Sequence, residues 1–208
     1  MIDGLNSHPI DLNILPQTNN TLRIIGGRYR GHRLHFIPRH RLRPTADRVR
    51  ETVFNWLQGE ITGCRVLDLF AGSGAMGLEA LSRGAAEVVF VEQDRKTAQH
   101  IRHNLTKLTD ATARSQVYSM SASAWLQRLT EPFDVVFLDP PFNSHLLIKT
   151  CQSLEESGML TDPAWVYLEQ DSQVTWPVLP EHWHWHREGS AGQAKFGLLQ
   201  REGPTTIG

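Results

Sequence analysis

The tetrapeptide D-P-P-F at positions 139–142 places an acid, two prolines and an aromatic residue directly after the apolar run FDVVFL. An exocyclic amine of a nucleobase is a poor nucleophile because its lone pair is delocalised into the ring. A carboxylate and a proline carbonyl can each accept one N–H of such an amine, and an aromatic ring can stack on an unpaired or flipped-out base. The alternative is a stiff turn at the exit of a strand. The expected catalytic residues are Asp139, Pro140, Pro141 and Phe142.

A second segment, DLFAGSGAMG at positions 68–77, contains the pattern G-x-G-x-x-G at Gly72, Gly74 and Gly77. This pattern matches the dinucleotide-binding fingerprint, and Glu92 follows at about the sequence spacing of a ribose-binding acid. A pyrophosphate would be repelled by Asp68, four residues before the first glycine. S-adenosylmethionine has no phosphate and carries an ammonium and a sulfonium, so the pattern favours it over a nicotinamide dinucleotide and over a turn without a ligand.

A third feature is a block of arginine near the N-terminus. Residues 23–50 hold nine arginines and a single acid, whereas the whole chain has a formal charge of −1. Guanidinium groups suit forked contacts to phosphate and stacking on bases. The block therefore favours a nucleic-acid surface over a solvated, salt-bridged one, and charge alone does not separate RNA from DNA.

Alternating strand and helix patterns can bring these residues together. Apolar runs typical of buried strands occur at CRVLDLF, EVVFVE, SQVYSM, FDVVFLD and AWVYLEQ, and helical patterns separate them. This alternation predicts a parallel sheet with helices on both faces, and the segments HWHWHRE and KFGLLQRE predict a closing antiparallel pair. Ligands of such sheets bind at the carboxyl ends of the strands, where Asp68, Glu92 and Asp139 are expected to converge.

The N-terminal part has a different pattern of apolar and charged residues. Alternating apolar and basic residues in 21–45 predict a hairpin, and RPTADRVRETVFNWL predicts a helix capped by Thr45 or Asp47. Arg48 and Arg50 are expected to lie off the apolar face of that helix. The predicted organisation is a loose leader (1–20), a basic hairpin and helix that bind RNA (21–60) and a catalytic domain (61–208).

These motifs together resemble the RsmD family, the bacterial 16S rRNA guanine-N2 methyltransferases. LRIIGGRYRG, LRPTADRVRETVFNWL, DLFAGSGAMGLEALSRGA, DPPF and REGSAGQAKFGLLQRE all resemble motifs of that family, from about Leu22 to Arg201. The resemblance implies a Rossmann-like class I methyltransferase fold, an α/β fold with a mostly parallel seven-stranded sheet and a small N-terminal hairpin and helix extension. It also implies transfer of a methyl group from S-adenosylmethionine to N2 of one guanine in 16S rRNA, within the small subunit or its assembly intermediate.

The resemblance assigns further roles by position. Ser121 stands where many such enzymes have an acid or asparagine that contacts the adenine amine, so backbone groups near Ala122 are expected to contribute. Cofactor-binding residues are expected at Asp68, Phe70, Ala71, Gly72, Ser73, Gly74, Glu92, Gln93, Ser121, Ala122 and Asp139. RNA-binding residues are expected at Arg28, Arg30, Arg33, Arg41, Arg43, Thr45 and Arg48.

Composition narrows the remaining possibilities. No apolar run has the length of a membrane span, the leader has no secretory features, and the two cysteines form no C-x-x-C pattern. We therefore expect a cytoplasmic monomer without a metal, and an edge strand rather than a metal site at HWHWH. Three alternatives remain: an adenine-N6 or cytosine-N4 methyltransferase, a nicotinamide-dependent oxidoreductase and a noncatalytic RNA-binding ribosome assembly factor.

Overall fold

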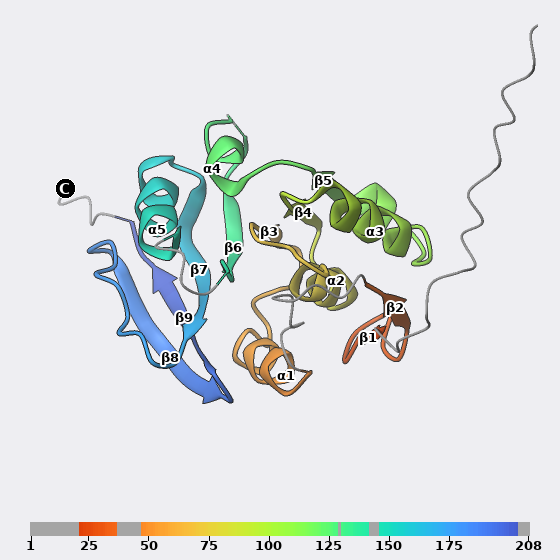
Figure 1. Cartoon of the computed structure of the whole chain (residues 1–208), viewed down its shortest axis with the longest axis horizontal. Coiled ribbons are helices and arrows are strands. Elements are labelled where there is room, and N and C mark those ends of the chain that lie inside the picture. Colours follow the sequence, from red (N-terminus) through yellow and green to blue (C-terminus); the bar gives the residue numbers. More distant parts are fainter. Residues whose placement is uncertain (1–20, 37–46, 129, 142–145, 204–208) are drawn as a thin grey trace, which may run out of the picture.

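The computed structural model describes residues 21–36, 47–128, 130–141 and 146–203, and its main feature is a seven-stranded sheet (Figure 1). The strands of this sheet are β3 (Arg65–Asp68), β4 (Glu87–Val91), β5 (Ser115–Tyr118), β6 (Phe133–Leu138), β7 (Leu160–Asp171), β8 (Trp183–Ala191) and β9 (Ala194–Arg201). The helices are α1 (Asp47–Trp56), α2 (Ala75–Ser82), α3 (Arg95–Leu105), the 3-10 turn η1 (Thr112–Arg114), α4 (Ala122–Trp125) and α5 (Leu146–Glu156). In the described part of the chain, no helix combines the length and apolarity needed to cross a bilayer.

The sheet is mostly parallel, with spatial order β5-β4-β3-β6-β7-β9-β8. Strands β3 to β7 pair in parallel, and β9 runs antiparallel to both β7 and β8. The chain leaves the central strand β3 toward β4 on one side and returns to β6 on the other. Ligands of open α/β sheets bind at such a switch point, and we call the carboxyl ends of β3, β4 and β6 the crevice. The predicted parallel sheet and its closing antiparallel pair are confirmed.

Helices cover both faces of the sheet, as the alternating pattern predicts. On one face α1, α2 and α3 pack on the strands, where the rings of Phe54 and Phe137 lie 5.8 Å apart. On the other face α4 and α5 pack, and the ring of Trp125 lies 5.8 Å from that of Phe133. Each parallel strand therefore sends side chains into two apolar layers, which explains the near-continuous apolar runs of its sequence.

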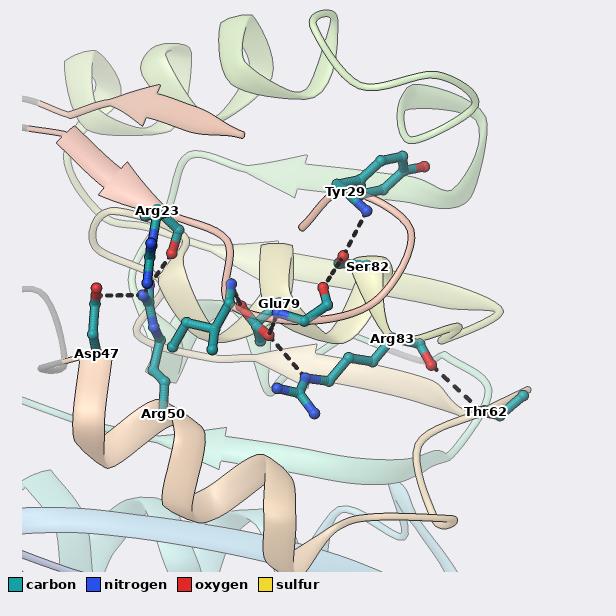
Figure 2. Close-up of polar contacts among 10 residues, drawn as sticks. Arg23, Tyr29, Asp47, Arg50, Thr62, Glu79, Ser82 and Arg83 are labelled. Atoms are coloured by element: carbon teal, nitrogen blue, oxygen red, sulfur yellow. Dashed lines mark hydrogen bonds and ion pairs between the residues drawn. The ribbon is translucent and has the colours of Figure 1, made fainter. Parts of the chain in front are cut away.

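The N-terminal segment forms a separate antiparallel pair, β1 (Thr21–Arg23) and β2 (Arg33–His35), that lies beside α2 and α3 (Figure 1). Its turn is fastened to α2 by the buried carboxylate of Glu79. One oxygen accepts the backbone N–H of Ile25 at 2.9 Å. The other accepts the backbone N–H of Gly26 and the Nε–H of the Arg83 side chain, each at 2.8 Å (Figure 2). A buried carboxylate is tolerated only when it is paired, and here the donors come from the hairpin turn and from Arg83 at the end of α2.

The side chain of Arg50 is fully buried on α1, so the prediction that it lies off the buried face is wrong. Its guanidinium donates to the carbonyl of Arg23 at 2.8 Å and pairs with Asp47 at 2.6 Å (Figure 2). The reason is tertiary: the chain around β1 covers the side of α1 that helical periodicity alone assigns to solvent. Arg48 is exposed, as predicted.

We predict that Glu79→Gln lowers the free energy of unfolding by about 3–5 kcal/mol, because it leaves the turn and Arg83 without their buried anion. Urea denaturation followed by circular dichroism measures the loss. The matched control is Asp110→Asn, which removes the anion of an exposed pair with Arg28 and should cost about 0–1 kcal/mol. Equal losses in the two variants would contradict the role given to Glu79.

Candidate active site

The carboxyl ends of β3, β4 and β6 meet at one edge of the sheet. In the strand register, Asp68 pairs with Phe90 on one side and with Phe137 on the other. Glu92 and Asp139 each lie two residues beyond those partners. The structure therefore brings the three acids that the sequence singles out to neighbouring positions along a single crevice.

The glycine loop that follows β3 is bent back onto β4. Ala71 donates to the carbonyl of Val91 at 2.9 Å, and both Gly72 and Gly74 have positive φ angles, of 50° and 80°. The third glycine of the motif has a different reason to be glycine, because a Cβ on Gly77 would lie 2.2 Å from a ring carbon of Phe90. Only the first two glycines thus shape the loop, while the third allows α2 to pack closely on the sheet.

The carboxylate of Asp68 fixes the start of α2. Its Oδ2 accepts the backbone N–H of Gly77 at 3.0 Å, although the N-cap residue Gly74 has no side chain to do so. Burial raises the pKa of Asp68 to about 7, the charge of Glu92 adds to this, and the Gly77 N–H opposes it. A carboxyl group in this state would be stabilised as an anion by a cation, and the ammonium of an amino acid moiety meets that need.

Glu92 joins the loop to the next helix. Its Oε2 accepts the N–H of Gly72 at 2.9 Å and its Oε1 accepts that of Asp94 at 2.7 Å. Asp94 in turn caps α3 by accepting from the N–H and the hydroxyl of Thr97, each at 2.8 Å. Each carboxylate oxygen of Glu92 retains a lone pair, so the fixed carboxylate can still accept hydrogen bonds from a ribose diol.

The other residues that we expect to bind the cofactor differ in burial and in their hydrogen bonds. Ser121 caps α4 by accepting the N–H of Ala124 at 3.3 Å, so its hydroxyl is engaged with its own helix. Ala122 and Phe70 are half-buried and pack against the second apolar layer, whereas Gln93 is exposed. The hydroxyl of Ser121 is thus a weaker candidate for the adenine contact than the neighbouring backbone.

The DPPF segment follows β6 as predicted. Asp139 is half-buried, Pro140 is buried and Pro141 is exposed, while Phe142 lies outside the described residues. The pKa of Asp139 is raised well above its usual range, first by burial and then by the charges of Glu169 and Asp68. The carboxyl group of Asp139 therefore binds a proton more readily than an exposed aspartate does.

Sequence reasoning missed Glu169, a buried acid at the carboxyl end of β7. Leu138 pairs with Leu168, so Asp139 and Glu169 occupy the next positions of the two chain segments, and the charge of Glu169 acts on Asp139. The hydroxyl of Tyr167 donates to Glu169 at 2.6 Å. An acid that ends the apolar run WVYL, one strand after DPPF, was the available signal.

Comparisons with known proteins identify the family. A family model described as "Conserved hypothetical protein 95" matches residues 22–200. "Ribosomal RNA small subunit methyltransferase D" of Escherichia coli K12 is 46% identical over 181 residues, covering 87% of this chain and 90% of that protein. The chain belongs to the RsmD family.

Two further proteins support the same assignment. The Haemophilus influenzae protein of the same name is 39% identical over 187 residues, covering 89% of this chain and 96% of its own length. A solved structure from Escherichia coli, described as the methyltransferase yhhF, superposes with a TM-score of 0.81 and 43% identity, covering 88% of this chain and 98% of that one. The predicted Rossmann-like methyltransferase fold is confirmed.

The arginine residues that this RsmD-family chain is expected to use for RNA are only partly described. Arg30, Arg33 and Arg48 are exposed, and Arg28 is exposed but pairs with Asp110 at 2.9 Å. Between the hairpin turn and α1 lies a polar cavity of about 360 Å³. Its lining includes Arg23, Arg30 and Arg83, and the expected residues outside the described ranges are Arg41, Arg43 and Thr45.

We predict a pH-dependent stability that Asp68→Asn removes. The pKa of Asp68 rises from 3.8 to about 7 on folding, so between these values the folded protein binds a proton that the unfolded chain has released. The stability that Asp68 contributes is therefore present below about pH 4 and is lost as the pH rises through 7. Urea denaturation of the ligand-free protein and of Asp68→Asn from pH 4 to 8 tests this. A stability difference between the two that does not change with pH would contradict it.

Proposed function

We propose that this chain is an rRNA methyltransferase that moves the methyl group of S-adenosylmethionine to the exocyclic N2 of one guanine in 16S rRNA. The observation that carries the proposal is the meeting of Asp68, Glu92 and Asp139 along one crevice in a member of the RsmD family. The family relatives named as small-subunit rRNA methyltransferases support the RNA substrate.

The acids of the crevice fit this methyl donor better than a dinucleotide. Asp68 is available to the donor's ammonium, and Glu92 is held by two backbone donors in a position to accept from its ribose. The bound donor supplies a methyl group on a positively charged sulfur. Two buried or half-buried carboxylates beside the glycine loop would instead oppose a pyrophosphate.

Asp139 and Pro140 orient the target base. Each offers an oxygen to one N–H of the exocyclic amine, so the nitrogen lone pair faces the methyl group and the reaction depends on positioning. The buried Pro140 and the end of β6 fix the backbone at this point. We propose that the base is flipped out of its stack and that Phe142 covers its face.

We also propose the setting of this reaction. The substrate would be the small subunit or its assembly intermediate, the protein would act as a monomer, and the reaction would take place in the cytoplasm. The exposed Arg30, Arg33 and Arg48 would bind the RNA backbone, and Arg30 and Arg33 belong to the hairpin whose turn Glu79 of α2 holds in place.

The reaction is tested with small subunits that lack the modification, labelled S-adenosylmethionine and nucleoside mass spectrometry. We expect the label on N2-methylguanosine, and we expect Asp139→Ala to lower kcat by about 10²–10⁴-fold while S-adenosylhomocysteine still binds in calorimetry. Asp134→Ala is the matched control, because its carboxylate lies at the other end of β6 and accepts the N–H of Arg65.

The outcomes separate the alternatives. Label on adenosine or cytidine would overturn the choice of base, and full turnover by Asp139→Ala would overturn the role of that carboxylate. Absence of label on any RNA, with RNA binding retained, would overturn the enzymatic proposal in favour of a noncatalytic assembly factor.

The RNA surface is tested by the salt dependence of binding. We predict that Arg30→Ala and Arg33→Ala each reduce the slope of log K against log[salt] by about 0.7–0.9, because each removes one phosphate contact. Fluorescence anisotropy on an rRNA fragment between 50 and 300 mM salt measures the slope. Lys149→Ala, on the exposed side of α5, is the control and should leave it unchanged. An unchanged slope in the two arginine variants would contradict the proposed surface.

A further inference from the structure

Glu169 is a buried acid next to the proposed catalytic carboxylate, and the mechanism above gives it no task. Resting on the proposed function, we propose that Glu169 is a positioning residue that makes Asp139 the acceptor of the proton released as the target nitrogen gains its methyl group. Tyr167 holds Glu169 in place for this role.

The strand register puts the two acids side by side. Leu138 pairs with Leu168 in parallel β6 and β7, which run about 4.8 Å apart, and Asp139 and Glu169 are the residues that follow this last pair. Side chains two residues apart on a strand share a face, so Asp139 shares the face of Phe137 and Glu169 that of Tyr167. Both aromatic residues belong to the apolar layer under α1, and their rings lie 6.0 Å apart.

Among the residues that the structure describes, the groups around this pair include carboxyl groups, one phenol and apolar side chains. From β3, Asp68 lies on the same face, and its charge raises the pKa of Asp139. From β7, the hydroxyl of Tyr167 donates a hydrogen bond to Glu169. From β9, the residue paired with Glu169 is Phe196, whose outer side is covered by Trp56 of α1 at a ring distance of 5.6 Å. Two carboxyl groups at adjacent positions in such surroundings cannot both be charged without a large cost, so the pair tends to retain a proton.

Tyr167 gives Glu169 a fixed direction. Burial raises the pKa of Glu169, and the buried phenol, which donates to Oε2 of Glu169 at 2.6 Å, opposes that rise by favouring the charged form of the carboxylate. A charged Glu169 raises the proton affinity of Asp139, whose pKa is already raised by burial. Because the phenol donates to Glu169, the two acids differ: Glu169 carries the negative charge, and Asp139 accepts the proton.

The chemistry balances within the site. As the N–C bond forms and the S–C bond breaks, the nitrogen becomes positively charged and must lose one of its two protons. Asp139 reacts in its deprotonated form, which becomes populated as the pH rises: it accepts that N–H and takes the proton, so its carboxylate becomes a carboxylic acid and the base product is neutral. The proton leaves to water when the product departs, and Asp139 returns to its starting state.

The inference is tested first by the pH dependence of methylation. The Glu169→Gln variant lacks the neighbouring negative charge, so the pKa of Asp139 should fall. The midpoint of the rise of kcat with pH should therefore move to lower pH by about 1 unit or more. The plateau of kcat should fall by about 10–100-fold because the acceptor is a weaker base. Tyr167→Phe should shift the profile in the same direction by a smaller amount.

A control separates this role from a general loss of packing. Glu155→Gln removes a partly buried carboxylate on the opposite face of the sheet, where it accepts from Trp183 and Arg201. This variant should lose stability without moving the pH profile. A Glu169→Gln profile that keeps its midpoint, with only a lower plateau, would overturn the inference in favour of a structural role.

The second measurement needs no turnover and so distinguishes failure of the inference from failure of the proposed function. Carboxyl ¹³C NMR of the ligand-free protein, with the Asp139 signal assigned by its loss in Asp139→Asn, follows the titration of the pair. In the wild type the Asp139 signal should show a step that reports the ionisation of Glu169, and in Glu169→Gln this step should be absent and the Asp139 midpoint should lie at lower pH. Identical Asp139 titrations in both proteins would overturn the inference even if methylation is observed, whereas the expected titrations without methylation would refute only the proposed function.

Discussion

The buried carboxylate of Glu79 links the two parts of this molecule. It accepts two backbone N–H groups of the turn after β1 and the side chain of Arg83, and it lies on the helix that follows the glycine loop. Removing an anion from water is costly unless its hydrogen bonds are replaced, so the turn and α2 cannot separate without exposing an unsatisfied charge or rehydrating it. The arginine-bearing hairpin is thereby held at a fixed position relative to the crevice.

Much of the fold could be predicted from the sequence because the apolar residues of its strands and helices recur with a clear spacing. The apolar runs after Cys64 gave the strands in order, and the placement of acids at three strand ends predicted where they meet. Glu169 was missed because one acid at the end of an apolar strand resembles an ordinary exposed end, and only its pairing with β6 brings it beside Asp139. Arg50 and Glu79 were likewise beyond sequence reasoning, since both are polar residues on helices that become buried only when the hairpin covers them.

The crevice brings three carboxyl groups together in buried or half-buried surroundings. Asp68, Asp139 and Glu169 share one face of three adjacent strands, and the described surroundings raise the pKa of each. Such a cluster opposes folding of the ligand-free protein near neutral pH, and a cationic ligand offsets that opposition. The same feature therefore selects against anionic cofactors and couples the stability of the crevice to its occupancy.

Helix α2 also restricts how the chain can change length. Gly77 faces the sheet, where its backbone N–H meets Asp68, and Glu79 faces the hairpin two residues later, about 200° around the helix. One residue inserted between the two would turn Glu79 by a further 100° and leave the hairpin turn without its anion. An insertion outside the segment from Gly77 to Glu79 would keep both contacts, so helix α2 fixes the orientation of the glycine loop relative to the arginine-bearing hairpin.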